Sequence, residues 1–340
     1  MTNTFFISSY EKIIIERFHI CSWEFNTNVT LLEFGCEINK TSIEKKDKLN
    51  LSLYIPWLTK DTIVIDLYKQ LSSTENSRFI FNDSVNGTDM LDGGVNKAGI
   101  IHRFKDRAAL CILPVNFNVQ SNQLDIDVDL KPYNTSEKPN IYFRFCIKLK
   151  GKHISTRKLG INKSTIIYDV KVNEKRNIPV SQSEAFRDKE ICHIETCFCF
   201  NILPNRYDIV FPDSSLKNVR TLEHSSFNQY LGEIIDIPKD ELMVVFNKKS
   251  ENFNFFSIYT QERIGPAQFA AAILINVICG ILLFIPSYRK SYSPEMKLSE
   301  VWYNFPLEIY ISFTIAILSV AYFLWPKIIF YLKKISFGKK

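Results

Sequence analysis

The stretch Ile141–Lys150, which reads IYFRFCIKLK, alternates apolar and polar side chains along its length. The odd-numbered positions are all aliphatic or aromatic, whereas the even-numbered positions include Tyr142, Arg144 and Lys148. Successive side chains of a β-strand point to opposite faces, so a period of two indicates a strand with one apolar face. This pattern predicts that the chain around it folds as a sheet and not as a helix bundle.

A second alternating stretch, Leu124–Leu130, reads LDIDVDL and carries three aspartates on one face. We expect it to pair antiparallel with Ile141–Lys150, so that its acidic face lies beside the basic face of its partner. That register requires paired residue numbers to sum to an odd value, and it makes Asp127 and Arg144 cross-strand neighbours. Three aligned carboxylates are also a pattern for a divalent cation, but the basic strand supplies a simpler partner.

The rest of residues 1–262 contains short runs rich in Ile, Val, Phe and Tyr, separated by polar turns. These runs predict a mainly β fold, with a large β-sandwich or barrel-like cytosolic region and few short helices. A subdivision into two β modules near residue 155 is an alternative to one large sandwich. The further runs are 29–38, 49–58, 99–119, 166–172, 191–203, 242–246 and 253–259.

Helical periodicity is confined to a few segments of this region. Asp61–Leu71 has apolar residues at four-residue spacing behind a capping aspartate, and Leu216–Leu231 has an approximate apolar face. We also expect a short helical turn at Ser183–Ile191. Ser84–Gly99 lacks the order of a phosphate-binding loop and is expected to be a long hairpin connection.

Two long apolar runs lie near the end of the sequence. Pro266–Pro286 contains 21 residues without a charge, enough to cross a hydrocarbon core of about 30 Å. The second run, Leu307–Pro326, carries one charge, at Glu308. The sequence therefore predicts a C-terminal two-helix transmembrane hairpin over residues 266–332, followed by a basic tail at 333–340.

Basic residues beside the two runs predict the orientation of the hairpin. Eight lie beside the outer ends of the runs and three lie in the loop that connects them. Basic residues are enriched on the cytoplasmic side, so we expect a multi-pass protein of the inner cell membrane with both termini in the cytoplasm. The eight are Lys248, Lys249, Arg263, Lys327, Lys333, Lys334, Lys339 and Lys340, and the three are Arg289, Lys290 and Lys297.

Small and weakly polar residues recur at helical spacing in both runs. Such residues allow two helices to approach closely, within the hairpin or between protomers, and we interpret them as transmembrane packing positions, first of all within the hairpin. We also expect the protein to form a homo-oligomer. The packing positions are Ala272, Asn276 and Gly280 in the first run and Ser312, Ala316 and Ser319 in the second. Pore lining is the alternative, and it requires several copies because two spans cannot enclose a water path.

The net charge of +6 is unevenly distributed. Residues 266–340 hold 8 basic and 3 acidic side chains, so most of the excess belongs to the membrane segment and general nucleic-acid binding is not expected. Residues 148–176 hold 9 basic and 2 acidic side chains. This segment is either a solvated surface or a site for a nucleotide-like anionic ligand or for lipid headgroups. The candidate ligand-binding residues are Lys148, Lys150, Arg157, Lys158, Lys171, Lys175 and Arg176.

Local catalytic motifs are absent from the sequence, and we assign no catalytic residue, cofactor or metal site. Cys192, His193, Cys197 and Cys199 are zinc-ligand types within one short segment. Residues two apart on a strand have Cα atoms roughly 7 Å apart, and no second cysteine pair is present to close a tetrahedral site. We therefore interpret the segment as a buried strand.

These features favour a membrane-anchored sensor–effector, in which the β-rich region binds an anionic ligand or a cytosolic protein and the two spans oligomerise or perturb the bilayer. The layout resembles that of bacterial antiviral membrane effectors, in which a ligand-sensing β domain is joined to two spans. This resemblance implies a role in antiviral defence. The alternative is a membrane-tethered scaffold without catalysis that recruits a cytosolic partner, and a membrane enzyme with a dispersed site is the least favoured hypothesis.

Overall fold

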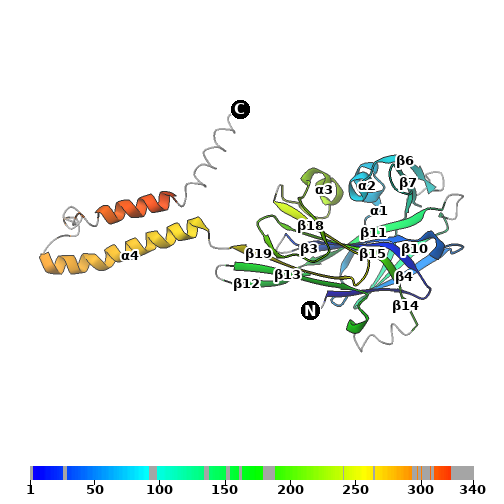
Figure 1. Cartoon of the computed structure of the whole chain (residues 1–340), viewed down its shortest axis with the longest axis horizontal. Coiled ribbons are helices and arrows are strands. Elements are labelled where there is room, and N and C mark those ends of the chain that lie inside the picture. Colours follow the sequence, from blue (N-terminus) through cyan, green and yellow to red (C-terminus); the bar gives the residue numbers. More distant parts are fainter. Residues whose placement is uncertain are drawn as a thin grey trace. The chain divides into compact units, whose positions relative to one another are not determined.

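The computed structural model describes residues 3–25, 29–91, 98–133, 138–150, 154–160, 163–178, 188–239, 241–262, 265–292, 297, 300, 307 and 310–322 (Figure 1). The chain divides into two compact units, one formed by residues 1–158 and 165–261 and the other by residues 159–164 and 262–340. The first unit is a β-sandwich with three short α-helices, and the second contains the apolar helices.

The first sheet of the sandwich has the strand order β16-β19-β13-β1-β4-β10-β9, with β12 beside β13 and β14 beside β1. It is a mixed sheet, because β1 runs parallel to β13 and antiparallel to β4. The strand bounds are β1 Asn3–Ser9, β4 Lys48–Tyr54, β9 Asn116–Gln120, β10 Gln123–Asp129, β12 Thr156–Leu159, β13 Lys163–Val172, β14 Glu190–Ile191, β16 Asp208–Phe211 and β19 Asn254–Glu262.

The second sheet has the strand order β17-β18-β15-β2-β3-β11-β8-β7-β6, with β5 beside β11. It is also mixed, because β2 and β15 run parallel whereas β2 and β3 run antiparallel. The strand bounds are β2 Ile14–Trp23, β3 Val29–Ile38, β5 Ile63–Asp66, β6 Val85–Met90, β7 Ile100–Phe104, β8 Leu110–Ile112, β11 Asn140–Lys150, β15 His193–Pro204, β17 Leu216–Thr221 and β18 Leu242–Lys249.

The main hydrophobic core unites side chains from the two sheets. Phe5, Leu51 and Ile126 of the first sheet and Phe34 and Phe143 of the second belong to one buried cluster. The odd-numbered residues of β11 all enter this cluster, as the alternation of that stretch predicts. Removal of these apolar side chains from water stabilises the packing of one sheet on the other.

A second core lies on the other face of the second sheet. Even-numbered residues of β11, Tyr142 and Cys146, are buried there with Leu71, Tyr230 and Leu231 of the helices. The sheet thus buries apolar area on both faces. The helices that cover it are α1 Tyr68–Leu71, α2 Thr74–Phe81 and α3 His224–Leu231, which lie on one side of the sandwich in Figure 1.

The predicted pairing of the two alternating strands is wrong. β10 pairs with β4 and β9 in the first sheet, whereas β11 pairs with β3, β5 and β8 in the second. Asp127 therefore lies opposite Asn50 and Asn116, and Arg144 lies opposite Gly35. The apolar faces of the two strands meet in the same core, so their polar faces point in opposite directions and cannot be neighbours.

Two expected helices are also partly wrong, because each contains a strand. Asp61–Leu71 holds strand β5 before the single turn of α1, and Leu216–Leu231 holds strand β17 before α3. In the expected connection Ser84–Gly99, residues 85–90 form β6. The expected turn at Ser183–Ile191 falls largely outside the described residues.

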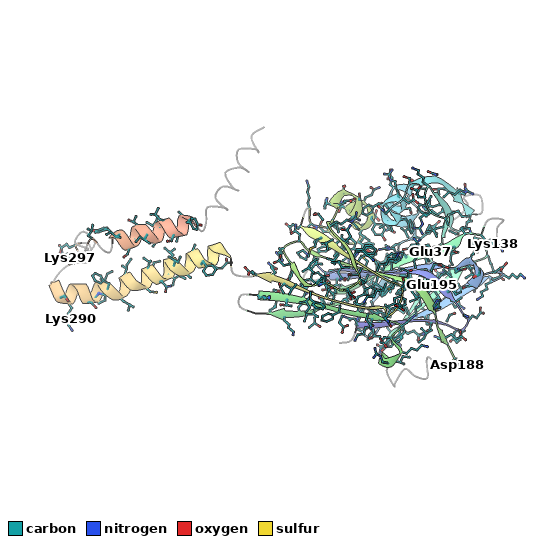
Figure 2. All side chains as sticks on the ribbon, in the orientation of Figure 1. Glu37, Lys138, Asp188, Glu195, Lys290 and Lys297 are labelled. Carbon is teal, nitrogen blue, oxygen red and sulfur yellow. The ribbon has the colours of Figure 1, made fainter. Side chains whose placement is uncertain are left out.

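Helix α4, Pro266–Tyr292, contains the candidate membrane span Gln268–Ser287, whose mean hydropathy is 2.6. Among the described residues it is the one helix with the length and composition to cross a membrane. The second expected span appears as a shorter apolar helix, Tyr310–Tyr322, with its flanks outside the described residues. The structure therefore shows one candidate span and not the predicted two-helix hairpin. Figure 2 shows Lys290 near the end of α4 and Lys297 beyond it.

The small residues of the first run lie on the exposed side of α4. Ala272, Asn276 and Gly280 are exposed, whereas Ala270 is buried and Val277 is half-buried. In the second apolar helix the three expected packing residues differ in their exposure. Ala316 is buried, Ser319 is half-buried and Ser312 is exposed. A role of these residues in association between protomers stays a prediction.

Candidate functional site

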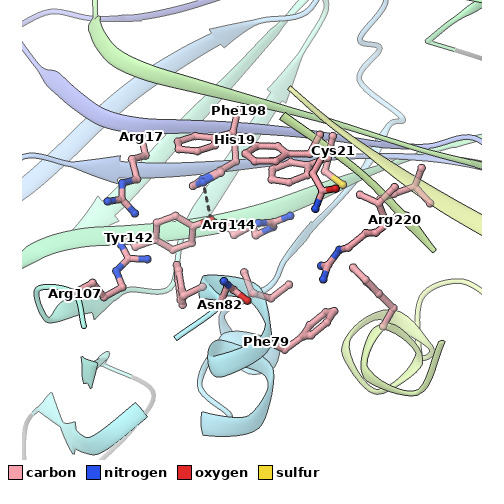
Figure 3. Close-up of a pocket in the computed structure, with 18 residues that line it drawn as sticks. Arg17, His19, Cys21, Phe79, Asn82, Arg107, Tyr142, Arg144, Phe198 and Arg220 are labelled. Carbon is pink, nitrogen blue, oxygen red and sulfur yellow. Dashed lines mark hydrogen bonds between the residues drawn. The ribbon is translucent and has the colours of Figure 1, made fainter. Parts of the chain in front are cut away.

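A pocket of about 420 Å³ lies on the outer face of the second sheet, beneath helices α2 and α3 (Figure 3). Strands β2, β11, β15, β17 and β18 supply its sheet side. Its described lining contains seven phenylalanine and tyrosine rings and no aspartate or glutamate. Four arginines complete it: Arg17, Arg107, Arg144 and Arg220.

A register shift in strand β2 places its polar residues in the pocket. Ile15 points into the core, and the ladder between β2 and β3 is irregular between Ile15 and Arg17. An extra residue at such a bulge reverses the faces of the strand that follows. Phe18 therefore points into the core, and Arg17 and His19 point into the pocket.

A row of aromatic rings forms the sheet side of the pocket. His19 stacks on Phe198, with ring centroids 4.8 Å apart. Phe246 lies nearly parallel to both Phe198 and Phe200, at interplanar angles of 5° and 9°. Neighbouring strands thus stack their rings on one another in a row, and a flat aromatic ligand can add to such a stack.

Arg144 is held by a buried carboxylate at the base of the pocket. Its guanidinium contacts Glu33 at 2.6 Å, and the Glu33 side chain is fully buried. Trp23 donates from Nε1 to the other oxygen of Glu33, and the Tyr230 hydroxyl donates to the oxygen that Arg144 contacts. The charge of Arg144 is therefore matched inside the protein, so this arginine shapes the pocket and adds little net positive charge to it.

Arg17 and Arg107 share one carboxylate, Glu37, which is labelled in Figure 2. Arg107 contacts it at 3.1 Å and Arg17 at 3.6 Å. The guanidinium of Arg107 also lies 5.0 Å from the ring centre of Phe81. Because two cations face one anion, this end of the pocket has an excess of positive charge.

Arg220 supplies the cation at the other end of the pocket, as Figure 3 shows. It projects from strand β17, and its guanidinium lies 3.2 Å from Glu223 with both side chains about half exposed. An exposed ion pair of this kind contributes roughly 0–1 kcal/mol. Arg220 therefore remains available to a bound anion at low cost.

Gly35 on strand β3 leaves room for the side chain of Tyr142, which lines the pocket. A Cβ atom at this position would collide with the hydroxyl of Tyr142 and lie 3.3 Å from Nδ1 of His19. With glycine there, the Tyr142 hydroxyl lies 3.4 Å from His19 Nδ1 and accepts a hydrogen bond from Arg144 at the same distance.

Burial lowers the pKa of His19 well below its usual value, and the nearby charges of Arg144, Arg17 and Arg107 lower it further. The imidazole is therefore neutral at pH 7 and serves as a stacking ring and not as a further cation. Burial raises the pKa of Cys21 well above its usual value, so this thiol is a poor nucleophile. The lining supports binding of an anionic, partly aromatic molecule.

The ligand-binding residues predicted from the basic segment lie elsewhere, on β11, β12, β13 and the turn that follows β13. None of them lines the pocket. Four have partners in the protein: Lys148 donates to the carbonyl of Ile234, Arg157 pairs with Glu24, Lys171 with Asp169, and Arg176 with Glu174. Lys150, Lys158 and Lys175 are exposed.

The cysteine-rich segment forms strand β15. Cys197 and Cys199 point into the core between the sheets, and burial raises the pKa of Cys199 to about 12. His193 contacts Glu195 at 3.0 Å on the exposed side of the strand. The ligand types in this segment thus alternate between core and solvent, and among the described residues no group of three lies together.

Sequence reasoning missed the residues that form the pocket. Arg144 lies in the stretch that alternates most clearly, but the sequence predicted that it would lie beside Asp127 on a neighbouring strand. Arg17 follows a bulge that breaks the alternation, and Arg220 lies in a segment that was expected to be helical. The alternating aromatics Phe198 and Phe200 were the one local signal, since they form a ring face opposite the buried cysteines.

The fold and the pocket together define a β-sandwich with an arginine-lined aromatic pocket beneath a helical cover. No protein-family model matches the chain, and no curated protein matches it.

Proposed function

We propose that the protein is a membrane-anchored sensor–effector whose β-sandwich binds an anionic ligand with an aromatic ring. The arginine-lined aromatic pocket carries the proposal. Guanidinium groups bind phosphate and carboxylate groups through paired hydrogen bonds, and a row of rings binds a planar group by stacking. We therefore assign the proposed ligand site to the outer face of the second sheet and no longer to the basic segment 148–176.

The effector part of the proposal concerns residues 266–332. The candidate span in α4 supports association with a membrane. We propose that Leu307–Pro326 forms the second span of a hairpin with both termini in the cytoplasm, which the distribution of lysine and arginine supports. Because two spans cannot enclose a water path, a channel that opens in response to ligand requires association of several copies. The resemblance in layout to bacterial antiviral membrane effectors supports such a role.

The first test is mass spectrometry of small molecules released by denaturing the full chain after purification in detergent. We expect an anionic aromatic compound with the wild type and its loss in the double variant Arg17→Gln, Arg107→Gln. Arg176→Gln is the matched control, because Arg176 is exposed and paired with Glu174 on the turn after β13. Loss in Arg176→Gln with retention in the double variant would instead place the site on the basic segment.

A second test separates the effector from the scaffold alternative. Replacement of residues 266–332 by an unrelated membrane anchor keeps the sandwich and its pocket but removes the native spans. We expect this chimera to bind ligand and to lose its effect on cells. Full cellular function of the chimera would support the scaffold, which needs only a tether.

A further inference from the structure

We propose that the ligand of the pocket is a small nucleotide of the dinucleotide type, with a base on the aromatic row and phosphates toward both cationic ends. This inference rests on the proposed function, because it specifies the chemistry of the same site. It follows from three features of the pocket: the parallel rings, the separation of the arginines, and the amide groups at the rim.

The rings favour a nucleobase over an aliphatic anion. Phe246 stacks on Phe200 with ring centroids 4.7 Å apart, and His19 continues the row through Phe198. Across the pocket, Phe79 contacts Phe227 edge to face at 4.5 Å. The lining thus offers stacked rings on the sheet side and an edge-to-face pair on the helix side, and both kinds of contact can extend to a planar heterocycle.

Arg17 and Arg220, at the two ends of the pocket, lie too far apart to share one phosphate. Along the ladder, Arg220 is paired with Val244, Val244 with Ile202, and Ile202 with Trp23. Arg17 lies further along the same strand as Trp23, so strand spacing and rise separate Arg17 from Arg220 by on the order of 20 Å between Cα atoms. Two anionic groups spaced along the ligand, one toward each of these arginines, match this separation.

Asparagine amides at the rim provide hydrogen-bond partners for base edges. Asn82 ends α2 in the left-handed conformation, with φ of 51°, and its exposed side chain lines the pocket. Asn218 lines it from β17 and is also exposed. An amide donates and accepts, as the edge of a nucleobase does. A volume of about 420 Å³ suits a small ligand.

Binding to the full chain in detergent tests the inference, with calorimetry and thermal shift as readouts. The probes are adenosine, AMP, inorganic pyrophosphate and the linear dinucleotides pApA, pGpG and pUpU. We expect one dinucleotide to bind more tightly than AMP and pyrophosphate. Phe246→Leu should weaken that dinucleotide by about 5- to 150-fold, the usual value of one stacked base.

The arginine variants test the two ends separately. Arg17→Gln should weaken both AMP and the dinucleotide, and Arg220→Gln should weaken the dinucleotide more than AMP. Two matched controls lie outside the pocket and should bind as the wild type does: Arg103→Gln on β7, where Arg103 pairs with Asp89, and Phe256→Leu on β19. The melting temperature without ligand shows whether each variant is folded.

The outcomes separate this inference from the proposed function. If pyrophosphate binds as tightly as every dinucleotide and Phe246→Leu has no effect, the pocket binds anions but not a base, and the inference is overturned alone. If Arg220→Gln weakens AMP as much as the dinucleotide, the two-ended arrangement is wrong. If no probe binds and nothing anionic is released from the purified chain, both the inference and the proposed function are overturned.

Discussion

The outer faces of strands β10 and β11 come from two sequence stretches with the same alternation, yet they lie in different environments. On β10 the polar face carries Asp127 and Asp129, which are exposed. On β11 the polar face carries Arg144, which is buried against Glu33 beneath the helices. The comparison shows that a period of two indicates which side chains share a face, but not whether the polar face meets water or a second layer of structure.

The two faces should differ most in how much stability the protein loses when a charged side chain is removed, and the largest loss is expected on β11. Arg144→Leu leaves Glu33 buried without its cation, and breaking a buried pair in this way costs about 3–5 kcal/mol. We expect the free energy of unfolding to fall by about that amount in chemical denaturation of the full chain in detergent. The double variant Arg144→Leu, Glu33→Leu should recover part of the loss, because no charge then remains buried.

A loss below about 1 kcal/mol in Arg144→Leu would show that water reaches Glu33. The helical cover of this face would then be looser than the structure indicates. In that case the two outer faces would differ little, and the comparison would fail.

The strand content and the core side of β11 could be predicted from the sequence, because alternation depends only on local order. β3 begins and ends at the residues expected from its apolar run. The pocket could not be predicted, since it depends on which strands lie together and on the bulge in β2. Arg17 and Arg220 are distant in sequence, and only the order β17-β18-β15-β2 places them on one face.

The charge distribution was a weaker guide to the pocket than the aromatic pattern. Residues 148–176 are rich in lysine and arginine, but Lys171 and Arg176 have local carboxylate partners. The Arg176 guanidinium beside Glu174 lowers the pKa of that carboxyl to about 2. A net charge summed over the segment does not show which of its basic side chains are paired.

A half-buried carboxylate beside the helical cover should make stability depend on pH. Burial raises the pKa of Asp66, at the end of β5, from 3.8 to about 6. The folded chain then holds this proton more tightly than the unfolded chain, so the contribution is present below about pH 4 and is lost as the pH rises through 6. The pH-dependent part is on the order of 2–3 kcal/mol.

Asp66→Asn should remove that part of the pH dependence. The two oxygens of Asp66 accept from the backbone N–H groups of Tyr68 and Val115, and an amide supplies one acceptor where the carboxyl supplies two. We therefore expect a variant less stable than the wild type at pH 4, with a flatter profile from pH 4 to 7 in thermal unfolding. An unchanged slope would show that Asp66 ionises in the folded chain as it does in water.

Gly35 tests how closely the face of the second sheet is packed at the pocket. Gly35→Ala places a Cβ against the Tyr142 hydroxyl, and overpacking of this kind costs roughly 1–3 kcal/mol. Tyr142→Phe removes the oxygen that collides, so the double variant should be more stable than the sum of the single effects predicts. Additive effects in this double-mutant cycle, measured by denaturation, would contradict the close approach of β3 and Tyr142.

The smallest effect is expected on the outer face of β10. Asp127 is exposed opposite Asn50 and Asn116, so Asp127→Lys should change the free energy of unfolding by no more than about 0.5 kcal/mol. If β10 and β11 paired as the sequence suggested, the new lysine would lie beside Arg144 and repel it. A loss above about 2 kcal/mol that disappears when Arg144 is also replaced would restore the sequence-based pairing and refute the two-sheet arrangement, because in the structure the polar faces of these strands point away from each other.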